Sequence, residues 1–165
     1  MIFVTVGTHE QPFNRLVEYI DNLKKDGIIK DEVMIQTGFS TYEPQYCKWS
    51  KLLPYQDMIK YVAEADLVIT HGGPSSFIMP LQVGKVPIVV PRYERYGEHV
   101  NDHQVEFAKA VAERQKNILV VEEVEQLKEM ILNYKAITES MSGGLNSNNK
   151  VFNERFERLV EGLFR

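Results

Sequence analysis

The chain has 165 residues, of which 44% are hydrophobic and 25% charged, and its formal net charge at pH 7 is −4. This length fits one globular domain, and the negative charge argues against a nucleic-acid binder, because phosphate backbones need a concentrated basic surface. Cys47 is the single cysteine, which excludes an internal disulfide and favours a reducing compartment.

Neither a secretory signal nor a membrane span is predicted. Residues 1–13 lack a basic leader and a long apolar core. No apolar run approaches the roughly 18 residues that a spanning helix requires. We therefore expect a cytoplasmic chain, which could still meet a membrane through a partner.

Short apolar runs alternate with amphipathic segments along most of the chain. Strands are predicted at residues 2–6, 33–37, 46–53, 67–70, 87–90 and 118–121. Helices are predicted at residues 13–27, 54–63, 74–82, 101–112 and 124–134. This alternation predicts an α/β fold with a parallel sheet covered by helices on both faces. Cys47 and Trp49 are expected to be packing residues.

The last part of the chain differs in composition. Residues 140–149 are rich in Gly, Ser and Asn, which is typical of a flexible connector between a main domain at 1–139 and a terminal helix at 150–165. The apolar residues of that helix form one stripe: Val151, Phe152, Phe156, Leu159, Val160, Leu163 and Phe164. The stripe either packs back on its own domain or docks on a partner or a membrane surface.

In an open parallel sheet, ligands bind beyond the carboxyl ends of the strands. The predicted strand at 67–70 runs into a glycine-rich turn, where Gly72 and Gly73 let a ligand approach the backbone and Pro74 suits the first turn of a helix. The amides at that helix start, with the Ser75 and Ser76 hydroxyls, would hold a phosphate without a net positive charge. A purely structural turn fits the pattern equally well.

Two other strand ends carry polar residues. His9 and Glu10 follow the first strand and could supply a base or a sugar contact, or form a solvated loop. The segment 91–104 is unusually long and polar for a connection, which favours a binding role over a simple solvated loop. His99 and His103 are spaced as metal ligands on a helix could be. No third ligand matches them and the chain has no Asp-x-Asp pair, so no metal is predicted.

Several motifs together resemble a known family. Residues 53–73 are similar to the C-terminal, donor-binding domain of family 28 glycosyltransferases. The whole chain resembles the stand-alone form of that domain, found as the catalytic subunit of two-subunit bacterial capsule and exopolysaccharide galactosyltransferases and of the dolichol-linked UDP-GlcNAc transferase. The resemblance extends from residue 1 to about residue 121 and is carried by the motifs at 6–11, 71–76, 87–92 and 97–104.

The resemblance implies a Rossmann-like sheet that forms one half of a GT-B fold. It also implies an inverting, metal-independent reaction without a cofactor, in which a UDP-hexose is the donor. His9 and Glu10 are the catalytic candidates. The implied donor-binding residues are Gly7, Thr8, Leu53, Tyr55, His71, Gly72, Gly73, Ser75, Ser76, Arg92, Glu98, Asn101, Asp102 and Gln104. Among them, Leu53 and Tyr55 would face the uracil, and Asn101, Asp102 and Gln104 the donor sugar.

One position departs from the family pattern. Met79 stands where the larger family usually has the glutamate that binds the ribose hydroxyls. Ribose recognition would then be weaker, or would move to Glu98 or Glu94. The two glutamates remain alternatives at this point.

The resemblance further implies a membrane-anchored, acceptor-binding partner, because a GT-B site lies between two domains. The expected reaction adds a hexose, with galactose preferred, to a lipid-linked saccharide in surface-polysaccharide synthesis. The isolated chain could form a homo-oligomer. One alternative is a subunit that binds the UDP-sugar or stabilises its partner without catalysis. Another is an unrelated small α/β protein that binds ATP or NAD.

Overall fold

The computed structural model describes residues 1–145 and residue 158 of the chain. Six parallel strands form one sheet in the order β3-β2-β1-β4-β5-β6. The strands are β1 (Ile2–Thr5), β2 (Val33–Gln36), β3 (Lys48–Ser50), β4 (Leu67–His71), β5 (Ile88–Val90) and β6 (Leu119–Val120). The helices are α1 (Asn14–Lys25), α2 (Tyr55–Glu64), α3 (Pro74–Gln82), α4 (His103–Gln115), α5 (Leu127–Leu132) and α6 (Tyr134–Leu145), with short 3₁₀ turns η1 (Glu94–Tyr96) and η2 (Val124–Gln126).

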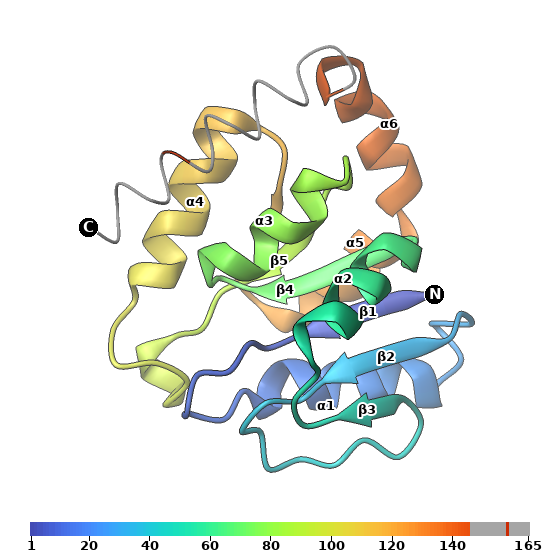
Figure 1. Cartoon of the computed structure of the whole chain (residues 1–165), viewed down its shortest axis with the longest axis vertical. Helices are drawn as coiled ribbons and strands as arrows, with labels where there is room; N and C mark the ends of the chain where they lie inside the picture. Colours follow the sequence, from blue (N-terminus) through green and yellow to red (C-terminus); the bar gives the residue numbers. More distant parts are fainter. Residues whose placement is uncertain (146–157, 159–165) are drawn as a thin grey trace.

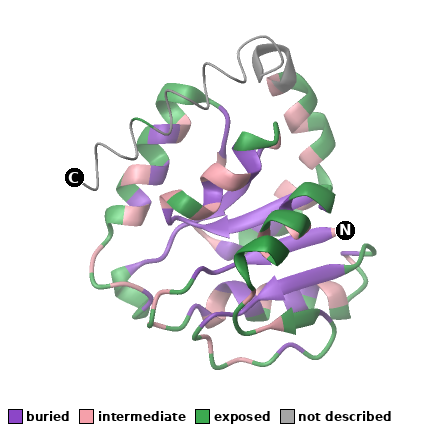
Figure 2. Cartoon of the chain, viewed as in Figure 1, coloured by how far each residue is buried: buried purple, intermediate pink, exposed green. Residues whose placement is uncertain are grey.

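Helices cover both faces of the sheet, as the sequence predicted. Alternate residues of β1 point to opposite faces: Val4 packs with α1 on one face, and Phe3 packs with Val62 of α2 on the other. Helix α5 adds to the first face, while α3 and α4 cover the second over β5 (Figure 1). Figure 2 shows the buried strands between helices whose outer faces are exposed. No helix in residues 1–145 is long and apolar enough to cross a membrane.

Several predicted boundaries change in the structure. The strand predicted at 46–53 contains only the three residues of β3, and the helix predicted from 101 begins at His103. The helix predicted at 124–134 is divided into η2, α5 and the start of α6. Helix α6 also continues to Leu145, so the first six residues of the predicted connector are helical. The remaining connector residues and the terminal helix, apart from Arg158, lie outside the described residues.

Of the two expected packing residues, Cys47 is buried but the prediction for Trp49 is wrong. The Trp49 side chain is 40% exposed. It pairs in register with Ile35 of β2, so it points to the α1 side of the sheet. Strand β3 forms the edge of the sheet, and the helix does not cover this outermost position.

The Asp21 carboxylate fixes the long connection between β2 and β3 to α1. It is fully buried and accepts hydrogen bonds from the Tyr42 hydroxyl (2.7 Å) and from the backbone amides of Gln45, Tyr46 and Cys47 (2.9–3.1 Å). Burial alone raises the pKa of this carboxyl, but the four hydrogen bonds outweigh burial and hold the pKa below its ordinary value. The connection therefore depends on the ionised form of one side chain.

We expect Asp21→Asn to lower the free energy of unfolding by about 2–4 kcal/mol at pH 7, because the amide turns a donor toward buried amide donors. The folded-state pKa is lowered, so this stabilisation is complete above the unfolded-state pKa of about 3.9 and is lost as the pH falls through the folded-state value. Urea unfolding at pH 7 and at pH 3 should show the difference between the two proteins shrinking in acid. Asp31→Asn, at an exposed position, is the control and should change little.

Candidate functional site

The carboxyl ends of β1, β4 and β5 bring the three predicted polar segments to one edge of the sheet. Thr5 of β1 pairs in register with Thr70 of β4, and Thr70 pairs with Val89 of β5, so the loops that follow these strands are neighbours. All four histidines of the chain lie at this edge of the sheet: His71 ends β4, His9 and His99 belong to the loops, and His103 begins α4.

The His71 imidazole lies at the centre of the site. Its Nδ1 accepts a hydrogen bond from the Gly73 amide (3.1 Å), so the neutral ring carries its proton on Nε2, which donates to the Ser76 hydroxyl (3.0 Å). Burial, and then the charge of Arg92, lowers the pKa of His71 to about 3. His71 is therefore neutral at pH 7 and fixes the turn between β4 and α3.

The glycines of the site are required by this histidine and by Gln104. A Cβ atom added to Gly7 or to Gly73 would overlap the His71 ring, and one added to Gly72 would lie 2.9 Å from Cβ of Gln104. Gly7 also has a φ of +73°, which disfavours other residues. The sequence suggested close approach of a ligand, whereas the structure shows close approach of the protein's own side chains.

Helix α3 begins at the edge of the site. Its first residue, Pro74, has no amide hydrogen, and the amides of Ser76 and Phe77 both bond to the Gly73 carbonyl (3.1 and 3.4 Å). Ser75 is exposed, and an amide at this second helical position has no acceptor within the helix. The positive end of the helix dipole and the exposed Ser75 are thus accessible to solvent, where an anion would be stabilised.

A cavity of about 610 Å³ adjoins this helix start. It is lined by Gly72, Pro74, His99, His103, Gln104, Glu106 and Phe107. Glu106 and Phe107 were missed by the sequence reasoning. The signal that could have found them is the helical spacing of 103, 106 and 107, which places these residues on one side of α4.

Gln104, Asn101 and Asp102 hold the start of α4 in place. Gln104 Oε1 accepts the Arg92 amide (3.1 Å), while its Nε2 lies 3.4 Å from Nδ1 of His71. Asn101 Oδ1 accepts the amide of His103 (3.0 Å), and Asp102 Oδ1 accepts the amide of Glu94 (2.9 Å). Of these three side chains, Gln104 is the one that lines the cavity.

Arg92 is fully buried and does not face the cavity, in contrast to its predicted donor contact. Its Nη1 donates to the carbonyls of Gln11 (2.7 Å) and Glu98 (3.0 Å), and its Nη2 donates to the carbonyl of Val6 (2.6 Å). Burial lowers the pKa of Arg92 to about 10, and Glu98 opposes that shift, so the guanidinium stays charged at pH 7. Arg92 therefore joins the loop after β1 to the loop after β5.

Glu98 also points inward, and its carboxylate is already occupied. Arg15 of α1 pairs with both of its oxygens (2.7 and 3.2 Å), and the Tyr93 amide donates to it (3.2 Å). Glu98 is thus unavailable for the ribose hydroxyls. Of the two alternatives, only Glu94 is exposed.

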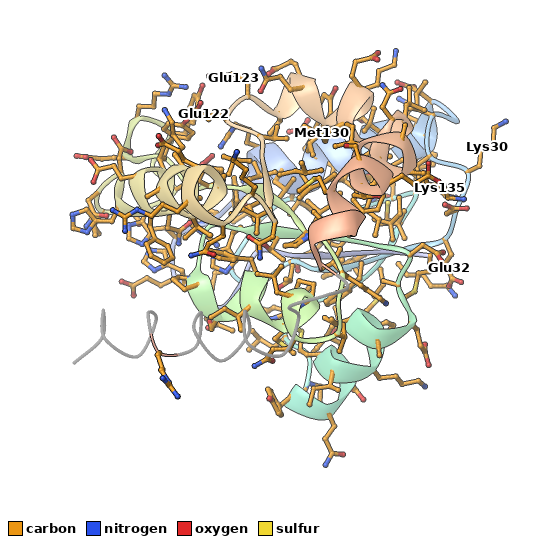
Figure 3. The ribbon with its side chains drawn as sticks, turned by 90° about the horizontal axis from the view of Figure 1, so that it is seen from above. Lys30, Glu32, Glu122, Glu123, Met130 and Lys135 are labelled. Carbon is orange, nitrogen blue, oxygen red and sulfur yellow. The ribbon has the colours of Figure 1, made fainter. Side chains whose placement is uncertain are left out.

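Arg15 was not identified from the sequence. Its guanidinium lies over the rings of Tyr96 (4.6 Å), Phe13 (5.4 Å) and Tyr93 (5.6 Å). It fixes the loop after β5 to α1, while the Tyr93 hydroxyl fixes it to Glu122 (2.9 Å). Glu122 and its neighbour Glu123 are labelled in Figure 3, next to α4.

The remaining predicted residues lie around this centre. Thr8 and Glu10 are exposed, and the His9 ring is stacked on that of His99 with centroids 4.5 Å apart. Tyr55, at the start of α2, is 71% exposed, and Leu53 packs against the apolar cluster beneath α2.

Met79 of α3 packs against the same apolar cluster as Leu53. It therefore offers no hydrogen bond at the position where the family has a glutamate. Among residues 1–145, no group of three or more His, Cys, Asp or Glu side chains is placed to hold a metal ion.

Comparison with known proteins finds a relative among the sugar transferases. UDP-N-acetylglucosamine transferase subunit ALG13 of Homo sapiens is 33% identical over 117 residues, which are 66% of this chain and 10% of that protein. The chain thus spans about a tenth of the length of this curated relative.

Solved glycosyltransferases share the fold at low sequence identity. The glycotransferase of kitacinnamycin superposes with a TM-score of 0.66 at 16% identity, covering 97% of this chain and 42% of that one. SnogD from Streptomyces nogalater gives a TM-score of 0.55 at 16% identity, with the same coverage of both chains. These neighbours are GT-B glycosyltransferases, and the six-stranded sheet is the Rossmann-like fold that they contain. Residues 1–160 match the glycosyltransferase family 28 C-terminal domain, and the chain therefore belongs to that family.

Proposed function

We propose that this chain is the catalytic, UDP-sugar-binding subunit of a two-component inverting glycosyltransferase. The observation that carries the proposal is the turn from β4 into α3. There Gly72 and Gly73 pack against neighbouring side chains, and the exposed Ser75 lies at a helix start beside the 610 Å³ cavity. A helix start of this kind binds a diphosphate without a metal ion. The name of the human relative, a UDP-N-acetylglucosamine transferase subunit, supports UDP as the carrier.

In this proposal the donor diphosphate lies at the start of α3, and the sugar enters the cavity beside Gln104. The uracil lies near Leu53 and Tyr55. Electrostatic stabilisation of the departing UDP comes from the helix dipole and from hydrogen-bond donors, which replace a metal ion and a cofactor. His9 and Glu10, in the loop after β1, are the catalytic candidates on this chain. In the turn after β1, Gly7 and Thr8 also contact the donor diphosphate.

The acceptor-binding half of the site belongs to a separate, membrane-anchored partner. The superposed part of this chain corresponds to 42% of each of these two solved neighbours, and the name of the human relative describes a subunit. The chain would then work in the cytoplasm at the inner face of the membrane, transferring a hexose, galactose for preference, to a lipid-linked saccharide. Capsule or exopolysaccharide synthesis is the corresponding pathway class.

The direct test is isothermal titration calorimetry of the chain with UDP, UDP-galactose, UDP-GlcNAc and ATP in the presence of a chelator. We expect binding that is selective for UDP compounds and unchanged by the chelator, and the tighter of the two sugars would identify the donor. Preference for ATP would contradict the proposal. If the chain alone binds none of these compounds, the titration is repeated with the co-expressed partner. Absence of binding by the pair would refute the donor-binding role.

A second candidate is a subunit that binds the donor without catalysis. The observation that favours it is Met79, which removes the usual ribose contact. Glu10→Gln separates the two, because a non-catalytic subunit tolerates this exposed substitution in the reconstituted pair. A catalytic subunit whose base is Glu10 would lose at least about 100-fold in turnover.

A further inference from the structure

The imidazoles of His9 and His99 form a nearly parallel stack, with ring centroids 4.5 Å apart and an interplanar angle of 15°. His9 comes from the loop after β1 and His99 from the loop before α4. His99 also lines the cavity together with Gly72 and Pro74, from the turn that starts α3. The stack thus connects the end of β1 to the wall of the cavity.

The hydrogen bonds of the two rings identify which ring nitrogen has a free lone pair for an additional proton. Oε1 of Gln11 lies 2.9 Å from Nε2 of His9, and this amide oxygen can only accept, so the neutral His9 ring carries its lone pair on Nδ1. Nδ1 of His99 accepts the Asn101 amide (3.4 Å), so its lone pair is already engaged. Nδ1 of His9 is therefore the position in the stack that can take up a proton.

The surroundings disfavour a positive charge on both rings at once. The titratable and charged side chains near the stack are His71 of β4, Arg92 after β5, His103 and Glu106 of α4, and Glu10 and Glu98 beside the two histidines. Burial lowers the pKa of His99, and the nearby charges of His9 and Arg92 lower it further. Two imidazolium rings in the stack would also repel each other. A dianionic diphosphate at the start of α3 would add negative charge beside the stack.

We propose that binding of a UDP-sugar is accompanied by uptake of one proton from solvent at Nδ1 of His9, so that an imidazolium stacked on the neutral His99 ring lies beside the donor diphosphate. The proposal rests on the proposed function, because it needs a diphosphate in the cavity. The step forms one N–H bond at Nδ1 of His9, with a proton released by hydronium or a buffer acid, and no bond of the donor breaks. His9 then balances the charge of the departing UDP, and Glu10 remains as the candidate base on this chain.

The test is calorimetry with UDP-galactose or UDP-GlcNAc, whichever binds, at pH 7.5 in two buffers that differ in ionisation enthalpy. The diphosphate of a UDP-sugar does not titrate near neutral pH, so any exchanged proton belongs to the protein. An opposite charge within about 4–6 Å raises the pKa of an imidazole by about 1–3 units. We therefore expect an uptake of about 0.5–1 proton per donor. Because a proton is taken up, affinity should rise by about 5–50-fold as the pH falls from 8.5 to 6.5.

Matched variants assign the proton to His9. His9→Phe keeps an aromatic ring for the stack and should abolish both the uptake and the pH dependence of affinity. His9→Gln is the second variant, and its melting temperature and that of His9→Phe are compared with the wild type. His103→Gln also changes a histidine of the cavity and should retain the uptake.

Binding of a UDP-sugar without proton uptake would overturn this inference and leave the proposed function intact. Uptake that persists in both His9 variants would overturn it as well. Failure of every UDP compound to bind, with or without the partner, would instead remove the proposed function itself.

Discussion

Arg92→Met should lower the free energy of unfolding by about 3–5 kcal/mol, the largest loss of stability expected from a single substitution in the candidate site. Methionine fills much of the buried volume, but it leaves the carbonyls of Val6, Gln11 and Glu98 without their donor. A buried carbonyl without a partner costs about 1–3 kcal/mol. Unfolding in urea, followed by circular dichroism, measures the difference.

The matched control is Arg95→Met in the same loop. Arg95 pairs with Glu123, but both side chains are about half exposed, and exposed ion pairs contribute about 0–1 kcal/mol. We expect the Arg95 variant to unfold close to the wild type. Equal losses in the two variants would mean that the buried hydrogen bonds of Arg92 add nothing to stability.

Gly73→Ala should weaken binding of the donor by at least about 100-fold. The backbone of Gly73 (φ −70°, ψ 125°) suits alanine, so the penalty comes entirely from overlap of the new Cβ with the His71 ring. To relieve it, His71 must give up its hydrogen bonds to the Gly73 amide and the Ser76 hydroxyl, which disturbs the helix start. We expect the disturbed helix start to lose two of its own hydrogen bonds to the diphosphate. Hydrogen bonds to a charged group are worth about 1.5–3 kcal/mol each, so this loss corresponds to at least about 100-fold in affinity.

Calorimetry with UDP, compared with Gly27→Ala, tests this expectation. Gly27 has a φ of +73° and open space around its Cα, so alanine there introduces backbone strain far from the site. Its variant should lose about 1–3 kcal/mol of stability and keep its affinity for UDP. Unchanged UDP affinity in Gly73→Ala would show that the turn is structural and that the diphosphate binds elsewhere.

The fold could be predicted because five of the six strands lie in short apolar runs of the sequence, separated by helices of ordinary length. The convergence of the loops after β1, β4 and β5 also followed from the sequence, since the carboxyl ends of parallel strands meet at one edge. The limits of β3 could not be predicted. Its sequence is mixed, and Trp49 looks like a core residue until the strand order places it at the edge.

The sequence could not predict whether an individual side chain of the site points toward the cavity or into the protein interior. Arg92 and Glu98 lie in a motif of polar residues, and a polar residue in a loop is as compatible with a ligand contact as with a buried hydrogen bond. For Glu98, the buried hydrogen bond comes from Arg15. Arg15 is 83 residues from Glu98 in the sequence and contacts it only in the folded protein. The His71 contacts with Gly7 and Gln104 likewise join separate loops.

The two outermost strands of the sheet are short, with three residues in β3 and two in β6. A strand of this length offers few unpaired amides and carbonyls to a neighbouring molecule, and Lys48 adds a charge on β3 that opposes pairing with a second sheet. We therefore expect these two edges of the sheet to resist strand pairing between molecules at the high protein concentrations that calorimetry needs. Lengthening β3 with apolar residues would remove that protection and promote aggregation.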